Sequence, residues 1–153
     1  MDILFVCLGN ICRSPLAEGI AKYYAKKLSL KLKIDSAGIS KWHSGESPCE
    51  GSINIARRHH IDISGLKSRQ VSVYGDSHFD LFIGMDRGNV ADLIELGFDK
   101  KRVRKLGEFG LSNADIPDPY GYKDEDGFES IYKMIDIGVR NLFEKIKQSG
   151  IIK

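Results

Sequence analysis

Five residues separate Cys7 from Arg13, and this pair could do chemistry on a phosphate. The segment between them, Leu8–Cys12, follows a short apolar run, Ile3–Val6, and precedes Ser14–Pro15, a pair typical of a helix start. Backbone N–H groups at a helix start have no intrahelical partner and, with the helix macrodipole, bind anions. The same field favours the thiolate form of a nearby cysteine. The spacing therefore predicts a phosphate-binding loop in which Cys7 attacks phosphorus.

Arg13 carries a permanent charge and a planar fork of donors that matches two phosphate oxygens. Gly9 and Asn10 both tolerate the positive φ that a tightly curled loop needs. We therefore expect the backbone from Leu8 through Gly9, Asn10, Ile11 and Cys12 to surround the substrate phosphate. The alternative is that Cys7 is an inert core cysteine at a strand end. The position of the loop between a strand and a helix favours catalysis.

A proton donor for the leaving group is expected in the late stretch 107–127, which is long, glycine-rich and acidic. Long loops of this kind are often functional, and a carboxyl group at the mouth of a site can protonate a departing phenolate. Four aspartates lie there, and spacing alone does not choose among them: Asp115, Asp118, Asp124 and Asp126.

Five segments together resemble the low-molecular-weight protein tyrosine phosphatases. They run in order through nearly the whole chain: Val6–Pro15, Asp35–Gly38, Trp42-His43, Met85-Asp86-Arg87 and Asp118-Pro119-Tyr120. The resemblance implies that Cys7 is the nucleophile and forms a phosphocysteine. It also implies that Arg13 binds the phosphoryl group and that Ser14 donates a hydrogen bond to the Cys7 sulfur. Asp118 would be the general acid and then the general base.

The resemblance also implies that Trp42 and Tyr120 wall a slot for a phenol ring, deep enough to exclude phosphoserine. Ile11 and Tyr120 favour tyrosine over arginine as the dephosphorylated residue, because related arginine phosphatases carry a smaller polar residue at the position of Ile11. Cys12 would form a reversible disulfide with Cys7, whereas Cys49 has no evident partner.

One departure from the family pattern lies at Leu66, where many members have a histidine that braces Asn10. The departure predicts that this hydrogen bond is absent here.

Strand and helix patterns alternate along the chain and predict a parallel sheet covered on both faces. Strands are expected at 3–6, 32–36, 81–83 and 103–106, and helices at 16–28, 52–60, 90–96 and from 128 to 146. The prediction is an α/β fold, an open four-stranded parallel sheet with helices on both faces and the phosphate-binding loop after the first strand. Residues 1–153 would form a single phosphatase domain. Ligands of such sheets bind beyond the carboxyl ends of the strands, where Cys7 lies.

Composition narrows the function classes. The net charge of +2 is too small to indicate nucleic-acid binding, and no stretch is long and apolar enough for a membrane span. Three cysteines do not suggest a secreted disulfide framework, no signal peptide is recognised, and we expect a cytoplasmic protein. The four histidines lack metal-ligand spacing, so no metal and no cofactor are expected.

The sequence thus predicts a protein tyrosine phosphatase, a monomer or weak dimer, that acts on phosphotyrosine-containing proteins or small aryl phosphates. Inorganic phosphate would be its product and inhibitor. Alternatives on the same scaffold are a protein arginine phosphatase, a thiol-dependent arsenate reductase and a non-hydrolytic phosphocarrier. The arsenate reductase needs a downstream cysteine relay, and only Cys49 follows Cys12.

Overall fold

The computed structural model describes residues 1–149 and contains one parallel sheet in the order β2-β1-β3-β4. The open four-stranded parallel sheet predicted from the sequence is confirmed. Its strands are β1 (Asp2–Cys7), β2 (Lys33–Gly38), β3 (Leu81–Gly84) and β4 (Val103–Lys105).

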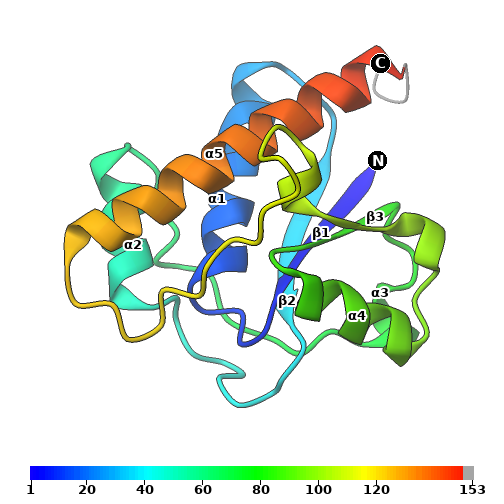
Figure 1. The fold of residues 1–153 in the computed structure, drawn as a ribbon, viewed down its shortest axis with the longest axis horizontal. Helices are drawn as coiled ribbons and strands as arrows, with labels where there is room; N and C mark the ends of the chain where they lie inside the picture. Colours follow the sequence, from blue (N-terminus) through cyan, green and yellow to red (C-terminus); the bar gives the residue numbers. More distant parts are fainter. Residues whose placement is uncertain (150–153) are drawn as a thin grey trace.

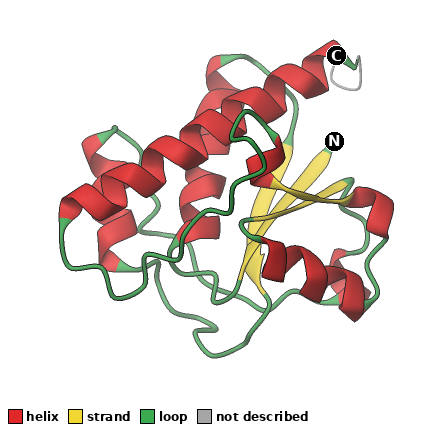
Figure 2. Ribbon diagram, in the orientation of Figure 1, coloured by secondary structure: helices red, strands yellow, loops and turns green. Residues whose placement is uncertain are grey.

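Helices cover both faces of the sheet (Figures 1 and 2). One face carries α1 (Arg13–Lys27), α2 (Glu50–Arg58) and α5 (Glu125–Gln148). The other carries the single turn α3 (Val73–Asp76) and α4 (Arg87–Leu96). Two short 3₁₀ turns flank β4, namely η1 (Lys100–Arg102) and η2 (Leu106–Glu108). None of the helices within residues 1–149 is long and apolar enough to cross a membrane.

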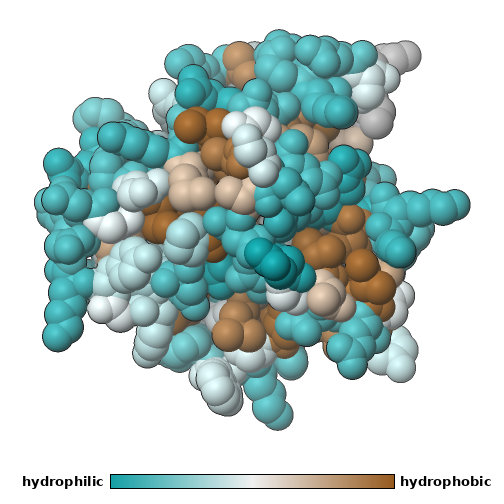
Figure 3. Space-filling model, viewed as in Figure 1, coloured by the Kyte–Doolittle hydropathy of each residue, from teal (hydrophilic) through white to brown (hydrophobic). Residues whose placement is uncertain are grey.

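The inner strand β1 is apolar from Ile3 onward because both of its faces are buried. Ile3 and Phe5 pack into the cluster beneath α1 and α5, whereas Leu4 and Val6 pack into the cluster beneath α4. All four side chains are fully buried. A strand that is buried on both faces has no solvent-exposed side, so apolar and polar residues do not alternate along it. The outer face drawn in Figure 3 is, by contrast, mainly hydrophilic, with small hydrophobic areas.

The predicted helices are present with shifted starts. α1 begins at Arg13 with Cys12 as its N-cap residue, not at Ser14, which lies inside the first turn. The reason is that the Ser14 hydroxyl is engaged by the Cys7 sulfur and by Asn10, so the side chain makes no cap. α2 likewise begins after Cys49, two residues before the predicted start. The predicted stop of α4 at Gly97, which has φ 109°, is confirmed.

The strand order opens a crevice at the end of β1. The chain runs from β1 to β2 on one side and then crosses to β3 on the other side of β1, and ligands of such sheets bind at this switch point. Cys7, the last residue of β1, pairs with Gly38, the last of β2. Figure 1 shows the late loop, in yellow, passing in front of α1 on its way to α5. The fold thus brings the first loop and the late loop to one edge of the sheet.

Candidate active site

The loop after β1 curls back over the sulfur of Cys7. The Asn10 backbone N–H donates to Cys7 Sγ at 3.2 Å, and Ser14 Oγ lies 3.0 Å from the same sulfur. Asn10 has φ 57°, so it makes the left-handed turn, whereas Gly9 does not have a positive φ. A Cβ at Gly9 would instead lie 3.0 Å from the His43 ring, so this glycine allows close packing. Two donors therefore converge on one buried thiol.

The Asn10 side chain holds the loop from beneath. Its Nδ2 donates to Ser14 Oγ at 2.7 Å and to Ser36 Oγ at 3.0 Å, and its Oδ1 accepts from the Arg69 backbone N–H at 3.1 Å. This brace comes from β2 and the segment after α2, so the loop is held although Leu66 replaces the histidine of the family pattern. Asn10 is buried, and only its backbone is directed at Cys7.

Arg13 is fixed by hydrogen bonds at its guanidinium. Nη1 donates to Asp86 Oδ2 at 2.6 Å and to the Ile116 carbonyl at 2.9 Å, and Nη2 lies 3.8 Å from Asp118 Oδ2. Asp86 is itself held as the N-cap residue of α4, where it accepts from the Asn89 N–H. A buried charge is stable only when it is paired and hydrogen-bonded, which these contacts provide.

A cavity of about 320 Å³ opens over the loop. Trp42 and Tyr120 form its outer part and are largely exposed, and the His43 and Tyr120 ring centroids lie 5.9 Å apart. The structure gathers nine of the residues expected at the site here: Cys7, Leu8, Gly9, Ile11, Cys12, Arg13, Trp42, Asp118 and Tyr120. Asn10 and Ser14 lie beneath the loop rather than in the cavity wall. Ser40 and His43 also line it and were not expected.

Comparison with known protein families gives a match along nearly the whole chain. The family described as low molecular weight phosphotyrosine protein phosphatase matches residues 2–150. The chain belongs to this family. Its members are hydrolases that act on phosphoric monoesters.

Several relatives cover nearly the full length of this phosphatase. It is 40% identical over 154 residues to the low molecular weight protein-tyrosine-phosphatase YfkJ of Bacillus subtilis (strain 168), covering 97% of each chain. It is 35% identical to PtpA of Staphylococcus aureus (strain MRSA252), covering 100% of this chain and 98% of PtpA. The crystal structure of YfkJ superposes with a TM-score of 0.90, at 39% identity and covering 97% and 96% of the two chains.

A relative of different specificity is also structurally close to this phosphatase. The Drosophila arginine phosphatase superposes with a TM-score of 0.89 at 28% identity, covering 96% of this chain and 98% of that one. The shared fold therefore does not by itself distinguish the residue that is dephosphorylated.

The four aspartates of the late loop have different surroundings. Asp118 is half-exposed and lines the cavity. Asp115 is bound 2.8 Å from Nζ of Lys105, whose hydrogen bond holds the pKa of that carboxyl below its ordinary value. Asp124 caps α5 through the Gly127 N–H, and Asp126 lies in the first turn of α5. Only Asp118 faces the phosphate-binding loop.

Two further residues at this candidate site were not expected from the sequence. Asp86 pairs with Arg13, and the signal was an aspartate two residues after the third strand, at the edge of the sheet where Cys7 lies. His43 follows Trp42 and lines the cavity, with its Nδ1 2.8 Å from Glu46 Oε2. Within residues 1–149 no group of three or more metal-binding side chains is gathered.

The expectation that Cys49 has no partner was wrong. Cys12 forms a disulfide with Cys49, with Cα atoms 5.3 Å apart, and Cys7 is the free cysteine. Cys12 does not bond Cys7 in this structure, and the start of α2 packs against the end of the loop, which brings Cys49 to Cys12. The Cys49 N–H donates to the Ile11 carbonyl at 2.6 Å and the Ser52 hydroxyl to the Cys12 carbonyl at 2.8 Å.

Proposed function

We propose that the protein hydrolyses phosphotyrosine in two steps through Cys7. The thiolate attacks phosphorus, the bond from phosphorus to the phenolic oxygen breaks, and a phosphocysteine forms. The observation that carries the proposal is the free, buried Cys7 at the end of β1, whose sulfur lies against Ser14 in the first turn of α1, with the Arg13 guanidinium in the same cavity. A helix N-terminus and an arginine both stabilise a thiolate and bind the phosphate dianion.

Arg13 and the loop N–H groups would hold the phosphoryl oxygens during the attack. Arg13 Nη1 is occupied by Asp86 and the Ile116 carbonyl, so the other guanidinium N–H groups remain for the substrate. Donors that are fixed before the reaction stabilise charge that develops in the transition state without reorganisation. In this proposal Asp86 sets the orientation of Arg13 and does not touch the substrate.

Asp118 would move the proton in both steps. Its protonated carboxyl donates the proton to the leaving phenolate. In the second step Asp118 takes a proton from water, the water oxygen attacks phosphorus, and the bond from phosphorus to sulfur breaks. The departing thiolate is received by the Asn10 N–H and by the Ser14 hydroxyl.

The aromatic walls indicate an aryl substrate. Trp42 and Tyr120 stand exposed at the mouth of the cavity, 83% and 66% accessible, and a phenol ring between them would cover apolar surface. We expect phosphoserine, which has no ring, to gain nothing from these walls. We therefore propose phosphotyrosine-containing proteins and small aryl phosphates as substrates, with inorganic phosphate as product and competitive inhibitor.

Arginine dephosphorylation is the second candidate, favoured by the structural likeness to the Drosophila arginine phosphatase. Ile11 argues against it here, since its apolar side chain lines the cavity where a guanidinium would need polar partners. Kinetics on matched phosphotyrosine and phosphoarginine peptides test the choice. We expect phosphotyrosine to be preferred and Ile11→Thr to shift the ratio toward phosphoarginine. A wild-type preference for phosphoarginine would replace the first candidate by the second.

A reducing compartment suits this chemistry, and we propose that the protein works in the cytoplasm as a single catalytic domain. Cys7 must stay a free thiol to act, which cytoplasmic thiols maintain.

Hydrolysis of p-nitrophenyl phosphate by Cys7→Ser tests the proposed function most directly. A serine hydroxyl in this loop lacks the thiolate charge, so turnover should fall to the uncatalysed rate. Cys49→Ser is the matched control, because it also removes one sulfur and should keep wild-type turnover under reducing conditions. Activity retained in Cys7→Ser would contradict the nucleophile, and absence of activity in the reduced wild type would contradict the function.

A further inference from the structure

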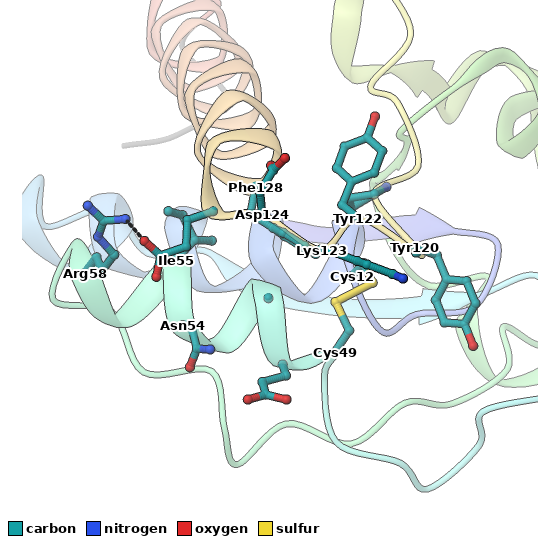
Figure 4. A pocket seen from close by; sticks show the side chains of 15 residues that line it. Cys12, Cys49, Asn54, Ile55, Arg58, Tyr120, Tyr122, Lys123, Asp124 and Phe128 are labelled. Carbon is teal, nitrogen blue, oxygen red and sulfur yellow. Dashed lines mark hydrogen bonds and ion pairs between the residues drawn. A yellow bond between two sulfur atoms is a disulfide. The ribbon is translucent and has the colours of Figure 1, made fainter.

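Cys12 is shared by two neighbouring cavities. It lines the catalytic cavity together with Cys7. It also lines a second cavity of about 490 Å³ together with Cys49, between α2 and the loop that begins at Pro119. Figure 4 shows the second cavity, with the disulfide between Tyr120 and the first turn of α2. The Cys12 sulfur therefore lies between the nucleophile and a third cysteine.

Hydrogen bonds hold the backbones of Cys12 and Cys49 together without the disulfide. The Cys49 N–H bonds the Ile11 carbonyl, and the Ser52 hydroxyl bonds the Cys12 carbonyl. These contacts keep the Cα atoms within the range that a disulfide requires. The two thiols of the reduced protein are thus already placed for bonding, and no large movement is needed.

Exposure and charge also suit Cys49 for thiol exchange. Cys49 is partly exposed, whereas Cys7 and Cys12 are buried. It is the N-cap residue of α2, a helix of nine residues, and the start of a helix stabilises a thiolate. Ser52 Oγ lies 3.3 Å from its sulfur. The last cysteine in such a series of thiol exchanges must be able to attack as a thiolate, and an external reductant must be able to reach it.

We propose that Cys49 is a resolving cysteine that returns Cys7 to its active form after oxidation by hydrogen peroxide. The inference rests on the proposed role of Cys7 as the reactive thiolate. First, Cys7 attacks peroxide, its sulfur gains one oxygen, and hydroxide leaves. The Cys12 thiol then attacks the Cys7 sulfenic acid, a Cys7–Cys12 disulfide forms, and water leaves.

The Cys49 thiolate completes the sequence. It attacks Cys12 Sγ, the Cys12–Cys49 bond forms, and the Cys7 thiolate leaves with the electron pair of the broken bond. The two oxidising equivalents of the peroxide end in the disulfide seen in the structure, with Cys7 free. An external dithiol reduces this bond later. The oxidised sulfurs are then those of Cys12 and Cys49 rather than that of Cys7, and the phosphatase stays active until the disulfide is reduced.

The test treats reduced wild type, Cys49→Ser and Cys7→Ser with one equivalent of hydrogen peroxide. Free thiols are then alkylated, disulfides are mapped by mass spectrometry, and turnover of p-nitrophenyl phosphate is followed without added thiol. The wild type should end with Cys12–Cys49 bonded and most of its activity regained. Cys49→Ser should accumulate Cys7–Cys12 and stay at least tenfold less active until dithiothreitol is added.

Three outcomes would overturn the inference. One is a stable Cys7–Cys12 bond as the wild-type end product. The second is recovery of Cys49→Ser as fast as the wild type. The third is Cys7→Ser forming the Cys12–Cys49 bond as fast as the wild type, which would mean that peroxide does not enter through Cys7. Failure of the proposed function is distinguishable, because it would leave the untreated reduced wild type without phosphatase activity.

Discussion

Arg13 donates a hydrogen bond of 2.6 Å to Asp86, and both side chains lie at the carboxyl ends of neighbouring parallel strands. The contact joins the first turn of α1 to the N-cap of α4, helices that lie on opposite faces of the sheet. A carboxylate at this place fixes one guanidinium nitrogen and turns the remaining donors toward the cavity. The arrangement of the sheet thereby sets the direction of the phosphate-binding charge.

Replacing Asp86 by asparagine should lower kcat/KM for p-nitrophenyl phosphate by about tenfold, since a misplaced Arg13 guanidinium binds the transition state more weakly. Asparagine keeps the size and can still accept a hydrogen bond, but it loses the charge that pairs with Arg13. Asp92→Asn, on the same helix, is the control and should keep its activity. Steady-state kinetics at pH 6 decide, and an unchanged kcat/KM in Asp86→Asn would show that Arg13 needs no such partner.

Removal of the Asp118 carboxyl should slow the enzyme in proportion to the basicity of the leaving group. General acid catalysis is typically worth about 10²–10⁴-fold, and a poor leaving group needs it more. We expect Asp118→Ala to lose about 10²-fold in kcat on phosphotyrosine and clearly less on p-nitrophenyl phosphate. Asp126→Ala is the control within the same stretch. Equal losses on both substrates would assign the proton transfer to another group.

The sequence predicted the loop between β1 and α1 well because the relation of its parts is local. Cys7, the loop and Arg13 are joined by short stretches of chain, and their relation follows from one strand and one helix. The late aspartates could not be ranked from spacing, since each sits in a loop of similar composition. What separates Asp115 from Asp118 is Lys105 at the end of β4, ten residues earlier in the chain, whose ammonium group donates a hydrogen bond to the Asp115 carboxylate.

Contacts between distant segments explain the remaining errors. The pairing of Cys12 with Cys49 depends on how α2 docks against the loop, and a separation of 37 residues carries no local signal. Asp86 and Arg13 are similarly brought together only by the strand order. The start of α1 differs from the prediction for another reason. Ser14 is a residue type that commonly caps a helix, but here its hydroxyl contacts the Cys7 sulfur instead.

Asp115 makes the stability of the protein depend on pH. Lys105, and Arg87 through further hydrogen bonds, hold the pKa of this carboxyl below its ordinary value. A carboxyl with a lower pKa in the folded state contributes stability above the unfolded value, and loses it as pH falls through the folded value. Wild type should therefore unfold at higher urea than Asp115→Asn at pH 7. The difference should shrink below a pH of about 4, near the ordinary aspartate pKa.

Urea unfolding at pH 7, 5, 4 and 3 measures this effect for both proteins. Asp92→Asn serves as the control, since no pairing with a buried lysine is lost there. A difference between wild type and Asp115→Asn that stays constant down to pH 3 would contradict the role of the ionised carboxyl.

Gly38 should be essential for the shape of the catalytic loop, although it makes no contact with substrate. A Cβ at this position would lie 2.9 Å from the Leu8 carbonyl oxygen and 3.0 Å from the Gly9 carbonyl carbon, both backbone atoms that cannot turn away. In Gly38→Ala the loop must shift by a few tenths of an ångström. Displacements of catalytic groups cost up to about a hundredfold in rate, so we expect kcat on p-nitrophenyl phosphate to fall by about tenfold or more.

Gly65→Ala is the matched control, because nothing lies within 4 Å of its added methyl group. A fully active Gly38→Ala enzyme would mean that the loop accepts the shift without loss, and that its geometry is less demanding than the two donors on Cys7 suggest.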